Sequence, residues 1–328
     1  MKTAKHLLLL GVALGAAGSA SCSIPKPDCT VAQTNPFGAG LTGVAAYAVQ
    51  FIPQGTLSCP QIKGDVVGMQ AYHPASASDP LVRDLSKTSI AIRTQTHGEL
   101  FWMNEDFGFP TDQDQPNALG DFVSNTPDEN DFCQVATAEA RVVFPGAQIP
   151  EDTGVPCVDT AECTADGGPG GDCTPVDPMD PMAGNTCVIT YDFEATDLTY
   201  RWSNLQFYVT AAATGSQFTA DVEIEVNGCK DQYKAVGMWP AVDCTHLLTG
   251  EPDVMMCHPD ADPNNTELPR LFGSGINPDF GPVICDTNFG TVPAVDLYTG
   301  GYANAPHCAL GTETIPALEG FPEITPVP

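Results

Sequence analysis

A cluster of oxygen-bearing side chains lies between residues 260 and 267, in a spacing that suits a metal ion. Its members are Asp260, Asp262, Asn264 and Glu267. Calcium prefers oxygen ligands from flexible loops of this kind. The glycine and the final glutamate of an EF-hand loop are missing, because Asn265 and Leu271 occupy their positions. Two interpretations therefore stay open: a calcium site, and a solvated turn rich in Asp, Asn and Pro.

Two other groups carry side chains suited to metal chemistry. The segment His97-Gly98-Glu99 supplies the H-x-E half of a zinc deaminase signature, but no P-C-x-x-C half follows it. Met255, Met256 and His258 are soft or imidazole ligands of the kind that copper prefers. The pattern occurs once, and its neighbour Cys257 is expected in a disulfide. We therefore expect a polar turn at residues 97–99 and no copper site.

The motifs of the common enzyme classes are absent from the sequence. It contains no G-x-S-x-G, H-E-x-x-H, C-x-x-C or Walker A pattern. Trp102, Trp202 and Trp239 could stack on sugar rings, but each lies in a predicted strand, where tryptophan usually belongs to the core. The sequence favours a binding or structural module without catalysis. The alternatives are a calcium-dependent adhesion or carbohydrate-binding module, and a secreted hydrolase with a dispersed site that uses His73, His97 or acidic side chains.

The first residues have the pattern of a secretory signal peptide. Lys2 and Lys5 precede the apolar run at residues 7–17, and small residues follow at positions 18–21. The apolar run is too short for a membrane-spanning helix, which needs about 20 residues. We therefore predict a signal peptide at residues 1–21 and export from the cytoplasm.

The end of this signal resembles the lipobox of bacterial lipoproteins. The resemblance rests on Ser19-Ala20-Ser21-Cys22, with Ser19 where that family usually has leucine. It implies that Cys22 becomes the first residue and carries lipid, which anchors the protein to the bacterial outer membrane or cell surface. Residues 22–40 would then be an extended tether, since proline disfavours helix there. Cleavage after Ala20, giving a secreted soluble protein, is the alternative.

The cysteine count supports the lipid anchor independently. The chain has 13 cysteines, and an even number remains once Cys22 is set aside. In an oxidising compartment these are candidates for disulfides. They are Cys29, Cys59, Cys133, Cys157, Cys163, Cys173, Cys187, Cys229, Cys244, Cys257, Cys285 and Cys308. Only three of them precede residue 150, so at least one disulfide must join the two parts of the chain.

The chain is strongly acidic. It has 12 basic and 41 acidic residues, a net charge of −29. Such a surface repels nucleic acid, so we expect none as a partner. The expected partners are the membrane, through the lipid anchor, and an unidentified protein or glycan. We expect no cofactor, except that calcium stays open.

Alternating apolar and polar residues predict an all-β fold of antiparallel, sandwich-like sheets. The pattern is clearest at residues 187–245, which we assign to an antiparallel meander with a type I′ turn at Asn227-Gly228. Residues 41–150 form the first half of the β region, with strands expected at residues 43–52, 90–94, 100–102 and 140–144 and a turn at 97–98. Helical turns are expected at residues 80–88 and 242–250.

Two parts of the chain show little alternation of apolar and polar residues. Residues 151–186 are rich in Cys, Gly and Pro, and "CVDTAECTADGGPGGDC" resembles the short Cys/Asp/Gly modules of exported bacterial surface proteins. We predict a disulfide-stapled insertion there. Residues 246–328 should be a loop-rich region pinned by disulfides, with a flexible tail.

Overall fold

The computed structural model describes residues 27–32, 46–164, 171–176, 184–210, 214–246, 249–258, 260, 274–276, 283–286 and 307–310. Several predictions fall outside these residues. They are the signal peptide, Cys22, most of the tether, the calcium candidates Asp262, Asn264 and Glu267, and the C-terminal tail.

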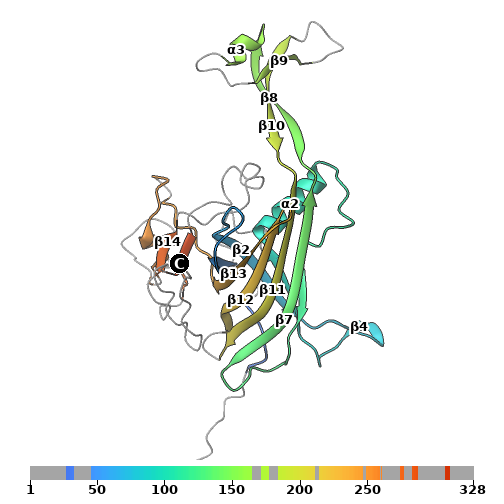
Figure 1. The fold of residues 1–328 in the computed structure, drawn as a ribbon, viewed down its shortest axis with the longest axis vertical. Helices are drawn as coiled ribbons and strands as arrows, with labels where there is room; N and C mark the ends of the chain where they lie inside the picture. The colour runs from blue at the N-terminus through green and yellow to red at the C-terminus, as the bar shows by residue number, and fades with distance from the viewer. Residues whose placement is uncertain are drawn as a thin grey trace, which may run out of the picture.

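The fold is all-β and antiparallel, as the sequence predicts, and its centre is one eight-stranded sheet (Figure 1). The spatial order of the strands is β6-β5-β2-β1-β13-β12-β11-β7. In chain order, the bounds are β1 Tyr47–Pro53, β2 Gly64–Tyr72, β5 Ser89–Thr94, β6 Ala118–Asp121, β7 Phe132–Phe144, β11 Thr196–Val209, β12 Thr214–Val226 and β13 Cys229–Met238. The hairpin between β12 and β13 turns at Asn227 and Gly228, which have φ of 52° and 81°. These values fit the predicted type I′ turn.

The sheet curls until its two edges meet. Phe122, just after β6, forms a bridge with Val135 of β7, and Gln115 forms another with Arg141. A Cβ added to Gly120 would come within 2.8 Å of the Val135 side chain, so the closest approach of β6 to β7 needs a glycine. Because of this curvature, the two halves of one sheet face each other across the core, as two layers of a sandwich do.

Helix α2 (Gln95–Asp106) closes one end of the core and corrects the prediction of a turn followed by a strand. Thr94 is its N-cap, and the Thr94 hydroxyl accepts a hydrogen bond from the backbone N–H of His97. Leu100 and Met103 lie in the main core. Thr96, His97 and Asn104 are buried on the same face, so polar residues interrupt the apolar period that would have revealed the helix. Trp102 is 50% exposed on the opposite face and is not a core residue.

A long two-stranded arm projects from the body, which is the eight-stranded sheet with α2 (Figure 1). Its strands are β8 (Ala147–Cys157) and β10 (Asn185–Phe193), with α3 (Thr160–Thr164) and β9 (Asp172–Pro175) near the tip. Contacts between aromatic rings hold the root of the arm. The ring centroid of Phe107, which follows α2, lies 5.9 Å from that of Phe193 and 6.0 Å from that of Phe144. The arm occupies the segment where the sequence predicts a stapled insertion, and its stem is more regular than the Gly and Pro content suggests.

The disulfides divide among three parts of the molecule. Cys29–Cys133 and Cys59–Cys229 lie in the body, and the second of these joins the two parts of the chain as the cysteine parity requires. Cys157–Cys173 and Cys163–Cys187 hold the tip of the arm, which we call the knob (described residues 157–164, 171–176 and 184–187). Cys244–Cys285 and Cys257–Cys308 lie in the C-terminal region.

The C-terminal region packs on the outer face of β1 and β13. Its elements are η3 (Val254–Cys257), β14 (Val283–Asp286) and β15 (His307–Leu310). Both of its disulfides are internal to the region, and the contact with the sheet is apolar. Met256 and Ile276 form one cluster with Ile52, Val236 and Met238. As a result β1 is buried on both faces.

The remaining differences from the sequence predictions are local. A small hairpin, β3 (Ala75–Ser76) and β4 (Asp79–Arg83), stands where residues 80–88 predict a helical turn. The described residues between 242 and 250 contain no helix either. Strand β2, in the middle of the sheet, is missing from the prediction, because six consecutive buried residues, Gly64 to Met69, hide the alternation.

Candidate functional site

The clearest surface feature is a grid of polar side chains on the outer face of four neighbouring strands. On β7, β11, β12 and β13, every second residue faces outward. The strand register places these outward residues side by side, in rows that run across the four strands. We call this set the outer-face grid. It consists of Thr137, Glu139 and Arg141; Arg201 and Ser203; Asp221, Glu223 and Glu225; and Lys230, Gln232 and Lys234. Thr199 has the matching register position on β11 but is buried.

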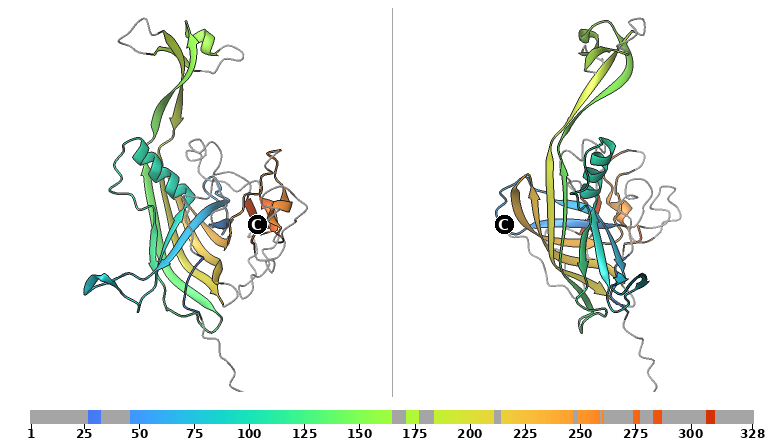
Figure 2. Two further views of the ribbon diagram at one scale, coloured as in Figure 1. Left: turned by 180° about the vertical axis from the view of Figure 1, so that it is seen from behind. Right: turned by 90° about the vertical axis from the view of Figure 1, so that its right-hand side faces the viewer.

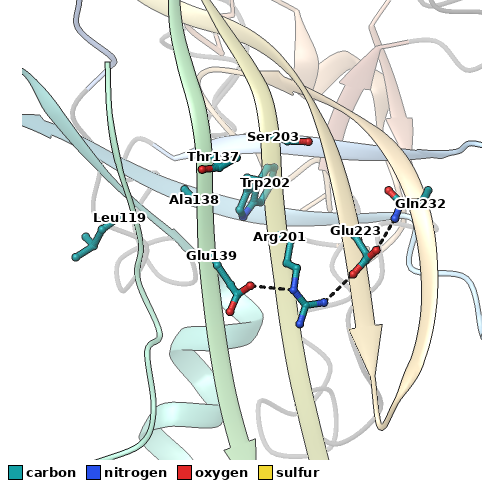
Figure 3. Close-up of a pocket in the computed structure, with 9 residues that line it drawn as sticks. All are labelled: Leu119, Thr137, Ala138, Glu139, Arg201, Trp202, Ser203, Glu223 and Gln232. Carbon is teal, nitrogen blue, oxygen red and sulfur yellow. Dashed lines mark hydrogen bonds and ion pairs between the residues drawn. The ribbon is translucent and has the colours of Figure 1, made fainter. Parts of the chain in front are cut away.

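Arg201 is the centre of the outer-face grid (Figure 3). Its register partners are Glu139 on β7 and Glu223 on β12. The Nε–H donates to Glu139 at 2.8 Å, and Nη1 donates to Glu223 at 2.7 Å and to Glu225 at 2.9 Å. Hydrogen bonding to Glu225 is the main cause of a raised pKa for Arg201, and the same bond lowers the pKa of Glu225. Glu225 is therefore held in its charged form.

The other charged side chains of the grid are also paired. Gln232 donates to the second oxygen of Glu223 at 2.6 Å, and Lys230 lies 3.0 Å from Glu225. Lys234 and Asn204 both donate to Asp221, at 2.9 and 2.7 Å. Four acidic and four basic side chains balance across the grid, in a chain whose net charge is −29. The outer-face grid is thus an electrically neutral area on an acidic protein.

A shallow hollow of about 480 Å³ opens over this grid. Its lining includes Arg201, Glu139, Glu223 and Gln232, and the exposed Leu119 of β6 forms an apolar side. Its lining has no histidine and no cysteine. The glutamates face a guanidinium and act as acceptors, so none of them is arranged as a general acid. The hollow is suited to hydrogen-bonding a polar ligand.

A second polar group lies inside the body, out of reach of solvent. The carboxylate of Asp65 on β2 accepts a hydrogen bond from the Thr96 hydroxyl at 2.6 Å, and the Tyr200 hydroxyl lies 3.5 Å from the same oxygen. The other oxygen of Asp65 has no hydrogen-bond partner among the described residues. Burial raises the pKa of Asp65 to about 7. Asp65 is therefore largely protonated below neutral pH.

His97 lies next to this group. Its ring packs edge-on against Tyr200 with centroids 4.8 Å apart, and its Nδ1 lies 2.8 Å from the Thr94 hydroxyl. Burial lowers the pKa of His97 to about 3. The neutral imidazole is fully covered, so His97 meets no solvent-borne substrate, and we interpret the group as part of the core.

The other residues considered from the sequence do not come together. His73 is exposed, and its Nδ1 lies 2.7 Å from the Lys87 carbonyl oxygen. His97 is buried in the core, so the two histidines do not share a site. Trp202 is buried in the core, and Trp239 packs against the same cluster. Asp260 is the only member of the calcium candidate set within the described residues. The sulfurs of Cys244, Cys257 and Cys308 lie close together, but each belongs to a disulfide.

Sequence reasoning missed the outer-face grid as a site. It identified Glu223 and Glu225 as the wet face of a strand, which is correct. The signal that could have found Arg201 is its place in "TYRWSN", where it alternates with the buried Tyr200 and Trp202 and so must point outward. The register that brings Glu139 opposite Arg201 joins residues 62 positions apart and cannot be read from a local pattern.

Three comparisons with known proteins bear on identity. The model of the family named MlpA matches residues 44–240, which include the whole outer-face grid and the arm. A Myxococcus xanthus protein described as "Putative lipoprotein MlpA" is 31% identical over 109 residues, which are 31% of this chain and 39% of that protein. The match thus spans well under half of the relative's length. No solved structure matches.

Proposed function

This chain belongs to the MlpA family, and from that premise we propose that it is a lipoprotein anchored through Cys22 to the bacterial outer membrane or cell surface. It acts there as a binding or structural module. The relative described as a lipoprotein supports the anchor, as does the lipobox-like sequence before Cys22. No helix among the described residues has the length and apolar character needed to cross a membrane.

One observation carries this proposal: the attachment of the N-terminal segment and the root of the arm lie at opposite ends of strand β7. Cys29 is bonded to Cys133, the second residue of β7, and β8 begins at Ala147, shortly after the last residue of β7, Phe144. Thirteen residues of extended strand span about 40 Å. The eleven residues of β8 add about 35 Å more. An anchor seven residues before Cys29 therefore leaves the knob far from the membrane.

The disulfides support the same interpretation. The six disulfides use every cysteine except Cys22, so Cys22 has no thiol partner within this chain. A small exported unit such as the knob lacks a core of its own and depends on such cross-links. Its buried apolar side chains are the cysteines Cys157, Cys163 and Cys187. The arm thus presents a disulfide-linked tip to the surroundings, an arrangement suited to a module that binds.

The two polar sites favour binding over catalysis. The charged side chains of the outer-face grid balance in number and form ion pairs, and the buried group of Asp65 and His97 is closed to solvent. We propose a protein or glycan partner, bound through the knob or the hollow over Arg201.

The anchor is tested by membrane fractionation in a bacterium that makes the full chain. We expect the wild-type protein in the membrane fraction, released by detergent and not by high salt. Cys22→Ser should move it to the soluble exported fraction. Ser21→Thr is a neighbouring control that leaves the cysteine in place. Equal distribution of Cys22→Ser and wild type would overturn the anchor.

A further inference from the structure

Exposed apolar side chains gather at the β3–β4 hairpin and its flank. Leu81 is 94% exposed, Val82 53%, and Leu85 69%, and Val123 on the neighbouring segment is 69% exposed. We call these four residues the apolar tip patch. The hairpin stands out from the body as a separate two-stranded element, on the part of the body away from the knob (Figures 1 and 2).

The hairpin is held in a defined position. Ala75 pairs with Arg83, and the backbone N–H of Asp84 donates to the Pro74 carbonyl at 2.8 Å. At its base, the His73 ring bonds the Lys87 carbonyl. The apolar side chains are therefore presented by a built stem, and their exposure is a property of the fold.

The base of the hairpin, which carries Leu85 of the apolar tip patch, lies next to the point where the N-terminal segment joins the body. The backbone N–H of Cys29 donates to the Asn125 carbonyl at 2.8 Å, and the Asn125 side chain donates to the Ser86 carbonyl at 2.8 Å. Phe122 donates to the Thr88 carbonyl at 2.9 Å, so residues 122–125 run beside residues 86–88. Cys29 lies seven positions after Cys22, and an extended chain over that distance reaches at most about 25 Å. A bilayer that holds Cys22 is thus within reach of the hairpin.

The charges around the patch also suit a lipid surface. Arg83 and Lys87 offset Asp79 and Asp84, whereas the whole chain has a net charge of −29. Anionic headgroups repel most of this protein's surface, and the hairpin is a neutral area where they do not. Tyr72, 37% exposed at the end of β2, adds an aromatic side chain of the kind that favours the boundary between lipid and water.

We propose that the apolar tip patch inserts into the outer layer of the bilayer that anchors Cys22, with the lipid bilayer as its partner. This inference rests on the proposed lipid anchor. Two attachments, the lipid and the hairpin, would fix the tilt of the body on the membrane. The arm would then stand away from the surface instead of lying along it.

The test is a tryptophan at the patch in the lipidated full chain, reconstituted in phosphatidylethanolamine and phosphatidylglycerol vesicles with or without brominated acyl chains. The variant is Leu81→Trp. Its matched control is Val158→Trp on the knob, where the side chain is 81% exposed. Wild type supplies the background of its own tryptophans. We expect brominated lipid to quench the added Leu81→Trp emission at least twofold and to leave that of Val158→Trp unchanged.

Each other outcome overturns the inference in a distinguishable way. If both variants float with the vesicles and Leu81→Trp is not quenched, the inserted patch is wrong while the anchor stands. If Leu81→Trp emission shifts to the blue with rising protein concentration and no lipid, the patch binds a second copy instead. If neither variant floats, the lipid anchor fails and the inference falls with it. Near-ultraviolet circular dichroism of both variants checks that the fold is kept.

Discussion

Thr96 and Asp65 are joined by a 2.6 Å hydrogen bond in the interior of the protein, between α2 and β2. Neither residue reaches solvent, and the second carboxylate oxygen of Asp65 has no hydrogen-bond partner in the described part of the chain. A buried carboxyl group in this setting favours its protonated form. The stability of the fold should therefore depend on pH through a residue that takes no part in binding.

The sign of that dependence follows from the pKa of Asp65, about 7 in the folded protein against an ordinary 3.8. Because the folded-state pKa is raised, the contribution of Asp65 to the free energy of unfolding is fully present below about pH 4. It is lost as the pH rises through 7. Asp65→Asn has no carboxyl group to ionise, so its stability should not fall in this way as the pH rises. Relative to wild type, its free energy of unfolding should gain up to about 4 kcal/mol between pH 4 and pH 8, at about 1.4 kcal/mol for each pKa unit. Urea unfolding at each pH measures it, with the exposed Asp112→Asn as a control that should follow wild type.

His97 should act in the opposite direction. Burial lowers the pKa of His97 to about 3, so its contribution to stability is present above pH 6.5 and is lost as the pH falls towards 3. His97→Gln cannot take up that proton. The free energy of unfolding of His97→Gln should be lower than that of wild type at pH 7. This difference should shrink by up to about 3 kcal/mol as the pH falls from 7 to 4. A deficit that is constant over this range would show that His97 does not titrate as its burial requires.

Arg201 should matter more to stability than Arg141, although both lie on the outer-face grid. Arg201 pairs with three carboxylates, whereas Arg141 pairs with one, Asp197, among the residues that the structure describes. The Arg201 side chain is 37% exposed, so solvent weakens its ion pairs. We expect Arg201→Met to cost about 1 kcal/mol and Arg141→Met about 0.5 kcal/mol or less in urea unfolding at low salt. The difference should narrow in high salt, since salt screens exposed charges; an equal cost for the two variants would contradict the central role of Arg201.

The disulfides of the body and of the knob should have separate effects. The knob has its own small apolar cluster, formed by Cys157, Cys163 and Cys187 and separate from the core of the body. Replacing its four cysteines with serine should leave the unfolding of the body unchanged and make residues 151–190 sensitive to limited proteolysis. Removing Cys29–Cys133, which closes a separation of 104 residues, should cost about 4 kcal/mol. Loss of body stability in the knob variant would show that the arm and the body fold as one unit.

The alternation of apolar and polar residues in the sequence predicted those strands that have one buried face and one exposed face. Strands β11, β12 and β13 alternate because one face is core and the other is the outer-face grid. Strand β2 is covered on both faces, so its pattern is continuous and gave no signal. Helix α2 was predicted as a strand because Thr96, His97 and Asn104 are polar yet buried. Asn104 donates to Asp114 and to the Val143 carbonyl, contacts that only the assembled fold provides.

The candidate site shows the same limit. Each residue of the outer-face grid points outward for a reason visible in the sequence, namely its alternation with buried neighbours. Their assembly around Arg201 depends on a register between β7 and β11 that skips the whole arm. The proposed lipid anchor rests on a local pattern and a count of cysteines, both of which the sequence contains. The structure adds the place where residues 27–32 meet the body.

The central claim is that Cys22 carries lipid while the other twelve cysteines form disulfides. Intact mass spectrometry of the native protein, without reduction, measures both at once. We predict a chain that begins at Cys22, heavier than its sequence by a diacylglyceryl group and further acylation. With all twelve remaining cysteines in disulfides, it should also show no thiol that reacts with iodoacetamide. A chain that begins at Ser21 with a reactive thiol at Cys22 would contradict the account.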